Sequence, residues 1–296
     1  MDRSQIQQIL GDTDPRWVTS SRVDRLENLN SVYAGERVLG EFGVPALDRC
    51  CPAATSCWRG AEDRTQQADA DVDDPFATAG SIFWPWIGEH YRAGGVCVVS
   101  MNLNMADGGE GWSLALEYGI ASDAVAAFER GDRTPFGNSS PFWWRTLATA
   151  GAILDSLDGV EVRHEPATTQ EANKILERIS RVQAVKCAPL REASKPTEAM
   201  IANCPTRFAT PEIKILDPGV IVAFGDAAWP AIQGLQDGGA QWHEEGPRFY
   251  RGVISPNPAQ PIDVLWLSHP TAWGTDWPEA QAALIASLVS HPLCSA

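Results

Sequence analysis

Four short apolar runs, rich in β-branched residues and separated by segments with helical spacing, constrain most strongly what this chain can fold into. The runs are residues 95–101, 181–186, 219–225 and 263–268. Helical spacing occurs in residues 141–157, 169–179, 196–216, 227–235 and 278–289. Strands that alternate with helices predict an α/β fold, with three layers (α/β/α) around a central, mostly parallel, four-stranded sheet.

The first 90 residues have a different pattern. Helical spacing near the start is followed by an acidic, alanine-rich stretch, residues 61–77, which we interpret as a surface loop. The pattern predicts an N-terminal extension of helices and loops, residues 1–90, that packs on a main domain of residues 91–296.

Charge and composition exclude several classes of protein. The chain has 23 Lys and Arg against 38 Asp and Glu, a net charge of -15, which argues against binding nucleic acid through bulk charge. Any contact with DNA therefore needs a local basic patch. No run of eighteen apolar residues occurs, and the first residues, MDRSQIQQIL, lack a basic segment followed by an apolar run. We expect a cytoplasmic protein without a membrane partner.

Polar residues follow the predicted strands, at the edge where open parallel sheets bind their ligands. Ser100 lies at the end of the first strand and Asn102 follows it, Gln183 lies within the second, and His269 follows the fourth. The chain has no Walker loop, GxGxxG, HExxH or GxSxG motif, which excludes the commonest nucleotide-binding, zinc protease and hydrolase patterns.

Residues 182–225, VQAVKCAPLREASKPTEAMIANCPTRFATPEIKILDPGVIVAFG, carry a family resemblance. The positions of Lys186-Cys187, Pro196-Thr197-Glu198, Cys204, Pro218 and Gly225 resemble the middle of the iron–sulfur uracil-DNA glycosylases. Three shorter motifs agree in order: VSMNL (99–103) is similar to GMNPG, SHPT (268–271) to HPS, and residues 134–143 to the PF and NRFW segment of the mismatch-specific branch. The resemblance covers residues 95–290 and makes residues 91–296 a uracil-DNA glycosylase-like catalytic domain.

The resemblance implies a role for each motif residue. Asn102 would orient the attacking water, and His269 would donate a hydrogen bond to O2 of the departing pyrimidine. Phe136 would stack on the flipped base, while Met101 and Leu103 would line the base pocket. Simpler interpretations exist: Asn102 and His269 as turn residues, and Phe136 as core packing.

Gln183 stands where the family's uracil readers have asparagine, so plain uracil is in doubt. Glutamine keeps an acceptor and two donors but changes their reach. The glycine-rich loop that follows Leu103, residues 107–111, would leave room for a substituent at C5. We therefore expect uracil or a 5-modified cytosine, such as the glucosylated hydroxymethylcytosine of phage DNA, as the substrate. The alternative for Gln183 is a buried amide that satisfies backbone groups.

Seven cysteines without an export signal favour metal binding or buried thiols over disulfides. Cys187 and Cys204 match the second half of the family's four-cysteine pattern, and Cys50, Cys51 and Cys57 supply enough thiolates for the first half at a different spacing. The resemblance implies a [4Fe-4S] cluster. Zinc on the same thiolates, or plain buried thiols, are the alternatives.

Contact with DNA would depend on a few side chains near the strand ends. Lys186, Arg191 and Lys195 follow the second strand, and Arg145 lies on the helix after Phe136. Trp273 stands where the family inserts a wedge into the duplex, although a surface aromatic there also fits simple packing.

These features predict a monomeric, monofunctional DNA glycosylase that flips a pyrimidine nucleotide and leaves an abasic site. No lysine occupies a motif position as a Schiff-base nucleophile, which favours hydrolysis. The alternatives are a non-catalytic DNA-binding module on the same fold and a hydrolase of small nucleosides.

Overall fold

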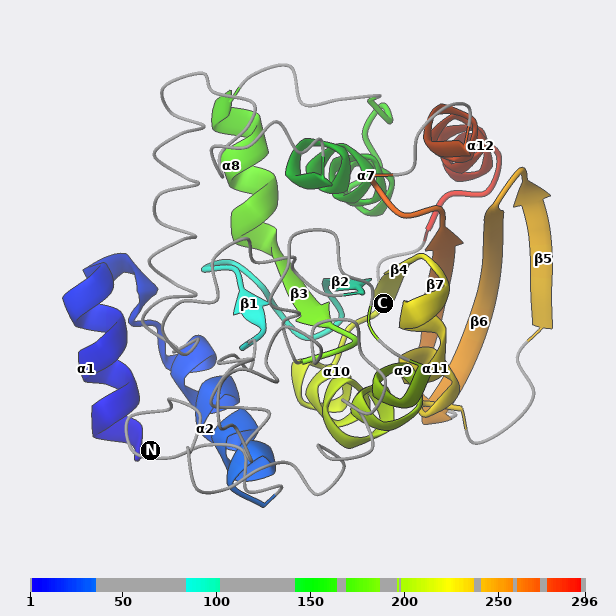
Figure 1. The fold of residues 1–296 in the computed structure, drawn as a ribbon. Helices are drawn as coiled ribbons and strands as arrows, with labels where there is room; N and C mark the ends of the chain where they lie inside the picture. The colour runs from blue at the N-terminus through cyan, green and yellow to red at the C-terminus, as the bar shows by residue number, and fades with distance from the viewer. Residues whose placement is uncertain are drawn as a thin grey trace, which may run out of the picture. The chain divides into compact units, whose positions relative to one another are not determined.

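The described part of the chain contains one seven-stranded sheet with strand order β1-β3-β2-β4-β7-β6-β5 (Figure 1). The structure is a computed structural model, and it describes residues 2–35, 84–101, 142–163, 169–186, 196, 198–236, 241–257, 260–271 and 276–293. The strands are β1 (Trp86–Ile87), β2 (Val96–Ser100), β3 (Ile179–Gln183), β4 (Val220–Phe224), β5 (Gln241–Gly246), β6 (Phe249–Asn257) and β7 (Gln260–Leu267).

Strands β2, β4 and β7 form a parallel core. Val99 pairs with Ala223, and Ala223 pairs with Trp266, so the three strands end at nearly the same level. All five residues of β2 and of β4 are buried. Continuous burial explains their unbroken apolar sequences, because a strand covered on both faces has no solvent side on which to alternate polar residues.

An antiparallel extension continues the sheet beyond β7. Strand β6 pairs antiparallel with β7, and β5 pairs antiparallel with β6. The sequence pattern did not predict this hairpin, because β5 (QWHEEG) is polar and mostly exposed at the edge of the sheet. Charged residues on an edge strand oppose pairing with other chains.

Residues 87–100, 120–181 and 216–296 form one of two compact units. Its helices are α7 (Phe142–Leu157), α8 (Thr169–Arg178), η4 (Asp226–Ala228), α11 (Trp229–Gln233) and α12 (Asp276–Ser290). Helix α7 contacts β2, α8 and α12, and α12 also contacts β5 and β6 (Figure 1). The rings of Phe224 and Trp277 lie 6.0 Å apart, so β4 and α12 share a buried aromatic contact.

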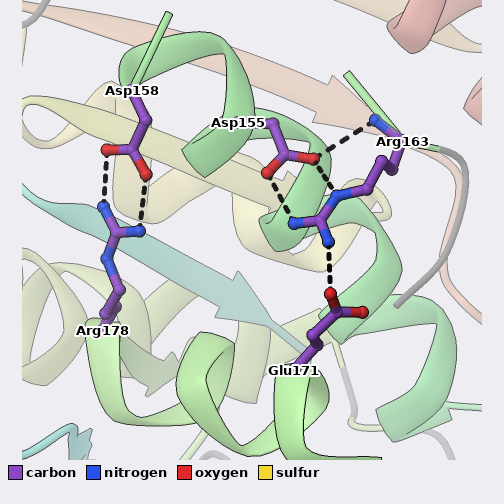
Figure 2. Close-up of polar contacts among 5 residues, drawn as sticks. All are labelled: Asp155, Asp158, Arg163, Glu171 and Arg178. Atoms are coloured by element: carbon purple, nitrogen blue, oxygen red, sulfur yellow. Dashed lines mark hydrogen bonds and ion pairs between the residues drawn. The ribbon is translucent and has the colours of Figure 1, made fainter. Parts of the chain in front are cut away.

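A network of ion pairs links the end of α7 to α8 (Figure 2). Arg163 lies 2.8 Å from Asp155 and 2.9 Å from Glu171, and Arg178 lies 2.7 Å from Asp158. Asp155 is buried, and its bidentate contact with Arg163 raises the pKa of that guanidinium further. Ion pairs of Arg163 and of Arg178 therefore connect the end of α7 and the residues after it to α8.

Residues 1–86, 101–119 and 182–215 form the other compact unit. Its described helices are α1 (Arg3–Thr13), η1 (Pro15–Trp17), α2 (Ser20–Gly35), α9 (Glu198–Cys204), the π-helical segment η3 (Pro205–Ala209) and α10 (Thr210–Leu216). Asp2 begins α1 with a capping box to Gln5. The π-helical segment begins at Pro205, which has no N–H to continue the α-helical ladder.

Aromatic residues pack the N-terminal helices of this unit. Trp17 and Trp86 meet edge to face at 5.3 Å, and the guanidinium of the buried Arg22 lies over both rings. Arg22 also donates to the carbonyl of Trp17 at 2.7 Å. A buried arginine is tolerated here because aromatic faces and a carbonyl replace water around its charge.

The predicted α/β class is confirmed, and each of the four predicted strands is present. The predicted count of four was too low, since β1, β5 and β6 enlarge the sheet to seven strands. Both compact units are assembled from discontinuous segments, and the division at residue 90 stays a prediction. None of the described helices has the length and apolar character that a membrane span requires. The expected acidic loop, residues 61–77, lies outside the described residues.

Candidate active site

The carboxyl ends of β2, β4 and β7 lie side by side and present small or polar residues. Parallel register places Ser100, Phe224 and Leu267 next to one another, so Gly225 and Ser268 begin the loops at this edge. His269 follows directly. This edge is where parallel α/β sheets bind ligands, because the loops diverge there.

The imidazole of His269 is held by Thr271. Its Nδ1 accepts a hydrogen bond from the backbone N–H of Thr271 at 3.3 Å and lies 2.7 Å from the Thr271 hydroxyl oxygen. An amide N–H that faces Nδ1 favours the neutral tautomer with its proton on Nε2, and the Thr271 hydroxyl can donate to Nδ1 in the same tautomer. Burial lowers the pKa of His269 to about 4, so the ring is neutral at pH 7. The result is a neutral imidazole with a hydrogen-bond donor at Nε2.

Gly225 allows the loop after β4 to approach His269. It has φ of 73°, a conformation that costs other L-residues energy, and a side-chain carbon added there would lie 3.5 Å from Cβ of His269. Its N–H donates to the carbonyl of Leu267, and its own carbonyl accepts from the indole of Trp266. Two hydrogen bonds thus fix the end of β4 to β7 beside the histidine.

Arg145 reaches the same loop from α7. Its Nη1 donates to the carbonyl of Pro270 at 2.6 Å, and its guanidinium lies over the ring of Trp277, with Cζ 5.6 Å from the ring centroid. From sequence we expected Arg145 to face DNA. The structure instead shows it bound to the loop that carries His269.

In the other unit, Met101 is joined to the segment that follows β3. Its carbonyl accepts a hydrogen bond from the N–H of Val185 at 2.9 Å. Gln183, predicted to read the base, has 1% of its surface exposed, and Met101 is half-buried. Both interpretations of Gln183, a base reader and a buried amide, place it inside the protein, so its role stays a prediction.

Lys186 lies in the core of this unit and not on a DNA-facing surface. Its Nζ is 2.5 Å from Oε2 of Glu212 on α10, and the side chains of the two residues are 1% and 0% exposed. The hydroxyl of Tyr33 on α2 donates to the other oxygen of Glu212. Burial raises the pKa of Glu212, and the Lys186 ammonium and the Tyr33 hydroxyl oppose that rise. An ammonium held in this way is not available to a phosphate, which corrects our expectation of a DNA contact.

Cys204 is the predicted thiolate ligand that the structure describes. It is a free, buried cysteine at the end of α9. Within the described ranges, no group of three or more His, Cys, Asp or Glu side chains gathers as metal ligands do. The remaining predicted site residues lie outside those ranges: Asn102, Leu103, Phe136, Arg191, Lys195, Trp273, Cys50, Cys51, Cys57 and Cys187.

Together, the parallel sheet and its helices define an α/β protein that places a neutral histidine at the carboxyl edge of the sheet, where proteins of this class bind their ligands. The family model of the uracil DNA glycosylase superfamily matches residues 62–289, and the chain belongs to this superfamily. Membership supports a DNA glycosylase-type function, with DNA as the substrate. No curated protein matches the sequence significantly.

Proposed function

We propose that this protein is a monofunctional DNA glycosylase that removes a pyrimidine base, either uracil or a 5-modified cytosine. The observation that carries the proposal is the state of His269: neutral, half-buried, with Nδ1 facing the N–H of Thr271, next to the carboxyl ends of three parallel strands. These contacts favour the tautomer with its donor at Nε2. Superfamily membership supplies the class of reaction.

The proposed reaction is a hydrolysis. The bond between C1′ of the sugar and N1 of the base breaks, and the electron pair leaves with the base. Water adds to C1′ and releases a proton, and the departing base anion takes up a proton at N1 from solvent, which leaves an abasic sugar and the neutral free base. Negative charge develops on O2 of the departing base, where the Nε2–H donor of His269 would stabilise it. Asn102 would orient the water.

A neutral donor suits this task. An imidazolium would have to be kept charged inside the protein, whereas burial has already displaced the pKa of His269 far below neutrality. The donor is therefore ready without any proton uptake, and the hydrogen bond strengthens only as the base gains charge.

Gln183 would set which base is accepted. At the end of β3 its buried amide can present either the carbonyl oxygen or the amino group, matching a 4-amino or a 4-keto pyrimidine respectively. The glycine-rich loop of residues 107–111 would accommodate a group at C5. Glucosylated hydroxymethylcytosine would make the enzyme an antiphage defence, and uracil would make it a repair enzyme.

A [4Fe-4S] cluster would be held by Cys204, Cys187 and two of Cys50, Cys51 and Cys57. Such a cluster would supply structural cross-linking, since soft thiolates bind iron well. Burial of Cys204 fits a ligand as well as a plain buried thiol. Iron and sulfide analysis of purified protein tests this, and Cys204→Ser should release iron if the cluster exists.

The test of function is abasic-site formation on DNA that carries uracil, thymine mismatches, hydroxymethylcytosine or glucosylated hydroxymethylcytosine. We expect strand breaks after alkali on at least one of these substrates with the wild type. His269→Ala and Asn102→Ala should lose most of the activity while they remain folded, and His243→Ala, on the exposed edge strand β5, is the matched control. Inactivity on every substrate, with a folded protein that still binds DNA, would favour a non-catalytic binding module; activity on free nucleosides alone would favour a nucleoside hydrolase.

A further inference from the structure

Arg145 and His269 contact opposite sides of one peptide group, the one that joins Pro270 to Thr271. The carbonyl oxygen of this group, on Pro270, accepts from Nη1 of Arg145 at 2.6 Å. Its N–H, on Thr271, donates to Nδ1 of His269 at 3.3 Å. The described residues contain no cis peptide bond, so this oxygen and hydrogen point in opposite directions from one rigid plane.

A planar peptide group couples the two hydrogen bonds. If the plane rotated, the Pro270 oxygen would leave the guanidinium, and at the same time the Thr271 N–H would turn away from Nδ1. A cation on the carbonyl also polarises the amide and makes its N–H a stronger donor, as in other chains of hydrogen bonds. Arg145 can therefore influence His269 without touching it.

The guanidinium is itself held in place. It lies over the indole of Trp277, whose side chain is buried in the first turn of α12. Cation–π contact and a charge-assisted hydrogen bond together restrict a side chain that would otherwise have many rotamers. Burial lowers the pKa of Arg145, and the group remains protonated at neutral pH.

We infer that Arg145 is a positioning residue that keeps His269 in its Nε2–H tautomer through the Pro270–Thr271 peptide group. The inference rests on the proposed function for its catalytic consequence, because only the Nε2–H tautomer donates toward the base. Without the guanidinium, the peptide plane is free to turn, and the ring then samples the Nδ1–H tautomer as well.

The tautomer can be measured without substrate. In protein labelled with ¹⁵N-histidine, the two ring nitrogens of His269 report which one carries the proton, and His269→Asn identifies the signals. We expect a protonated Nε2 and an unprotonated Nδ1 in the wild type. In Arg145→Met, which keeps the length of the side chain without its donors, we expect the two shifts to move toward each other. Arg145→Lys should restore most of the wild-type pattern, because an ammonium also donates to the carbonyl.

Arg178→Met is the matched control, since Arg178 pairs with Asp158 on the α7–α8 connection. It should leave the His269 signals and the activity unchanged. On a substrate that the wild type cleaves, Arg145→Met should lower kcat about tenfold and change KM much less, as expected for loss of one charge-assisted contact.

Wild-type ring shifts in a folded Arg145→Met protein would overturn the inference, whatever its activity. The same holds if activity falls while the tautomer stays unchanged, because Arg145 would then act in another way. If Arg145→Met does not fold, Arg145→Gln replaces it and retains one N–H donor without the charge; its shifts should lie between those of the wild type and of an unrestrained ring. Absence of glycosylase activity in the wild type would refute the proposed function and leave the tautomer result standing.

Discussion

Lys186 and Glu212 form an ion pair that is almost completely buried, with Nζ 2.5 Å from Oε2 and side chains 1% and 0% exposed. Such a pair stabilises weakly by itself, because two charges must leave water before they attract each other. The contacts that the pair makes between distant segments of the chain contribute more to the fold. Tyr33 donates to Glu212 from α2, and Lys186 follows β3, so the pair joins segments far apart in the sequence.

Removal of one partner of this pair should be strongly destabilising. In Glu212→Gln the ammonium of Lys186 remains buried without a countercharge, so we expect the free energy of unfolding to fall by about 3–5 kcal/mol. Urea unfolding followed by tryptophan fluorescence measures the loss.

The matched variants separate charge from packing. Tyr33→Phe removes one hydrogen bond to the same carboxylate and should cost about 1–3 kcal/mol. The double variant Lys186→Met with Glu212→Leu should recover most of the loss, since both charges disappear together. A double variant less stable than Glu212→Gln would contradict this account of the pair.

His269 should contribute to pH-dependent stability with a defined sign. Burial lowers its pKa in the folded protein to about 4, below the ordinary value of 6.5. The unfolded chain therefore binds the proton first, and the stability that neutral His269 provides is present above pH 6.5 and is lost as the pH falls toward 4. NMR titration of the ring should give a midpoint far below 6.5.

A variant tests the same linkage through stability. The difference in unfolding free energy between wild type and His269→Asn should shift against the wild type as the pH falls from 6.5 to 4. Parallel pH dependences of the two proteins would show that His269 is not the group responsible.

Loss of the His269 side chain should affect reaction more than folding. His269→Ala removes a donor aimed at developing charge, and the expected fall in kcat is about 10²–10³-fold. Thr271→Val keeps the backbone N–H that holds Nδ1 and removes only the hydroxyl, so it should retain most of the activity. Equal losses in the two variants would assign the main role to the Thr271 hydroxyl.

A side chain at Gly225 should lower the activity of the enzyme. Its φ of 73° and ψ of 173° lie in a region that almost only glycine occupies, so Gly225→Ala should cost about 1–3 kcal/mol in backbone strain. The added carbon would lie 3.5 Å from Cβ of His269, an ordinary contact, so the strain is what would move the loop beside the histidine. Gly159, with φ of 66° and open space around it, is the control for strain alone. We expect both Gly159→Ala and Gly225→Ala to lose stability, and only Gly225→Ala to lose activity at a temperature where both are folded.

The strands show how much of the fold could be predicted from the sequence. Apolar runs predicted β2 and β4 to within one residue at each end, because strands buried on both faces have unbroken apolar sequences. Strand β7 begins three residues before its predicted run, since its first residues, Gln260 and Pro261, are not buried. The rule that ligands bind at the carboxyl ends of parallel strands then led to His269. The polar hairpin β5–β6 was missed, since an exposed edge strand has neither a continuous apolar run nor strong alternation.

The sequence alone determined the α/β class, the order of the strand and helix segments and the superfamily motifs, because these depend on local periodicity and on residues close together in the chain. Only the tertiary structure decided the partners of the charged side chains. Lys186 and Arg145 both read as basic residues available to DNA, yet one is buried against Glu212 and the other binds the carbonyl of Pro270. The sequence around a charged residue does not identify its partner, since the partner of Lys186 is 26 residues away and that of Arg145 is 125 residues away. The fold selects that partner by bringing distant segments together and excluding water around them.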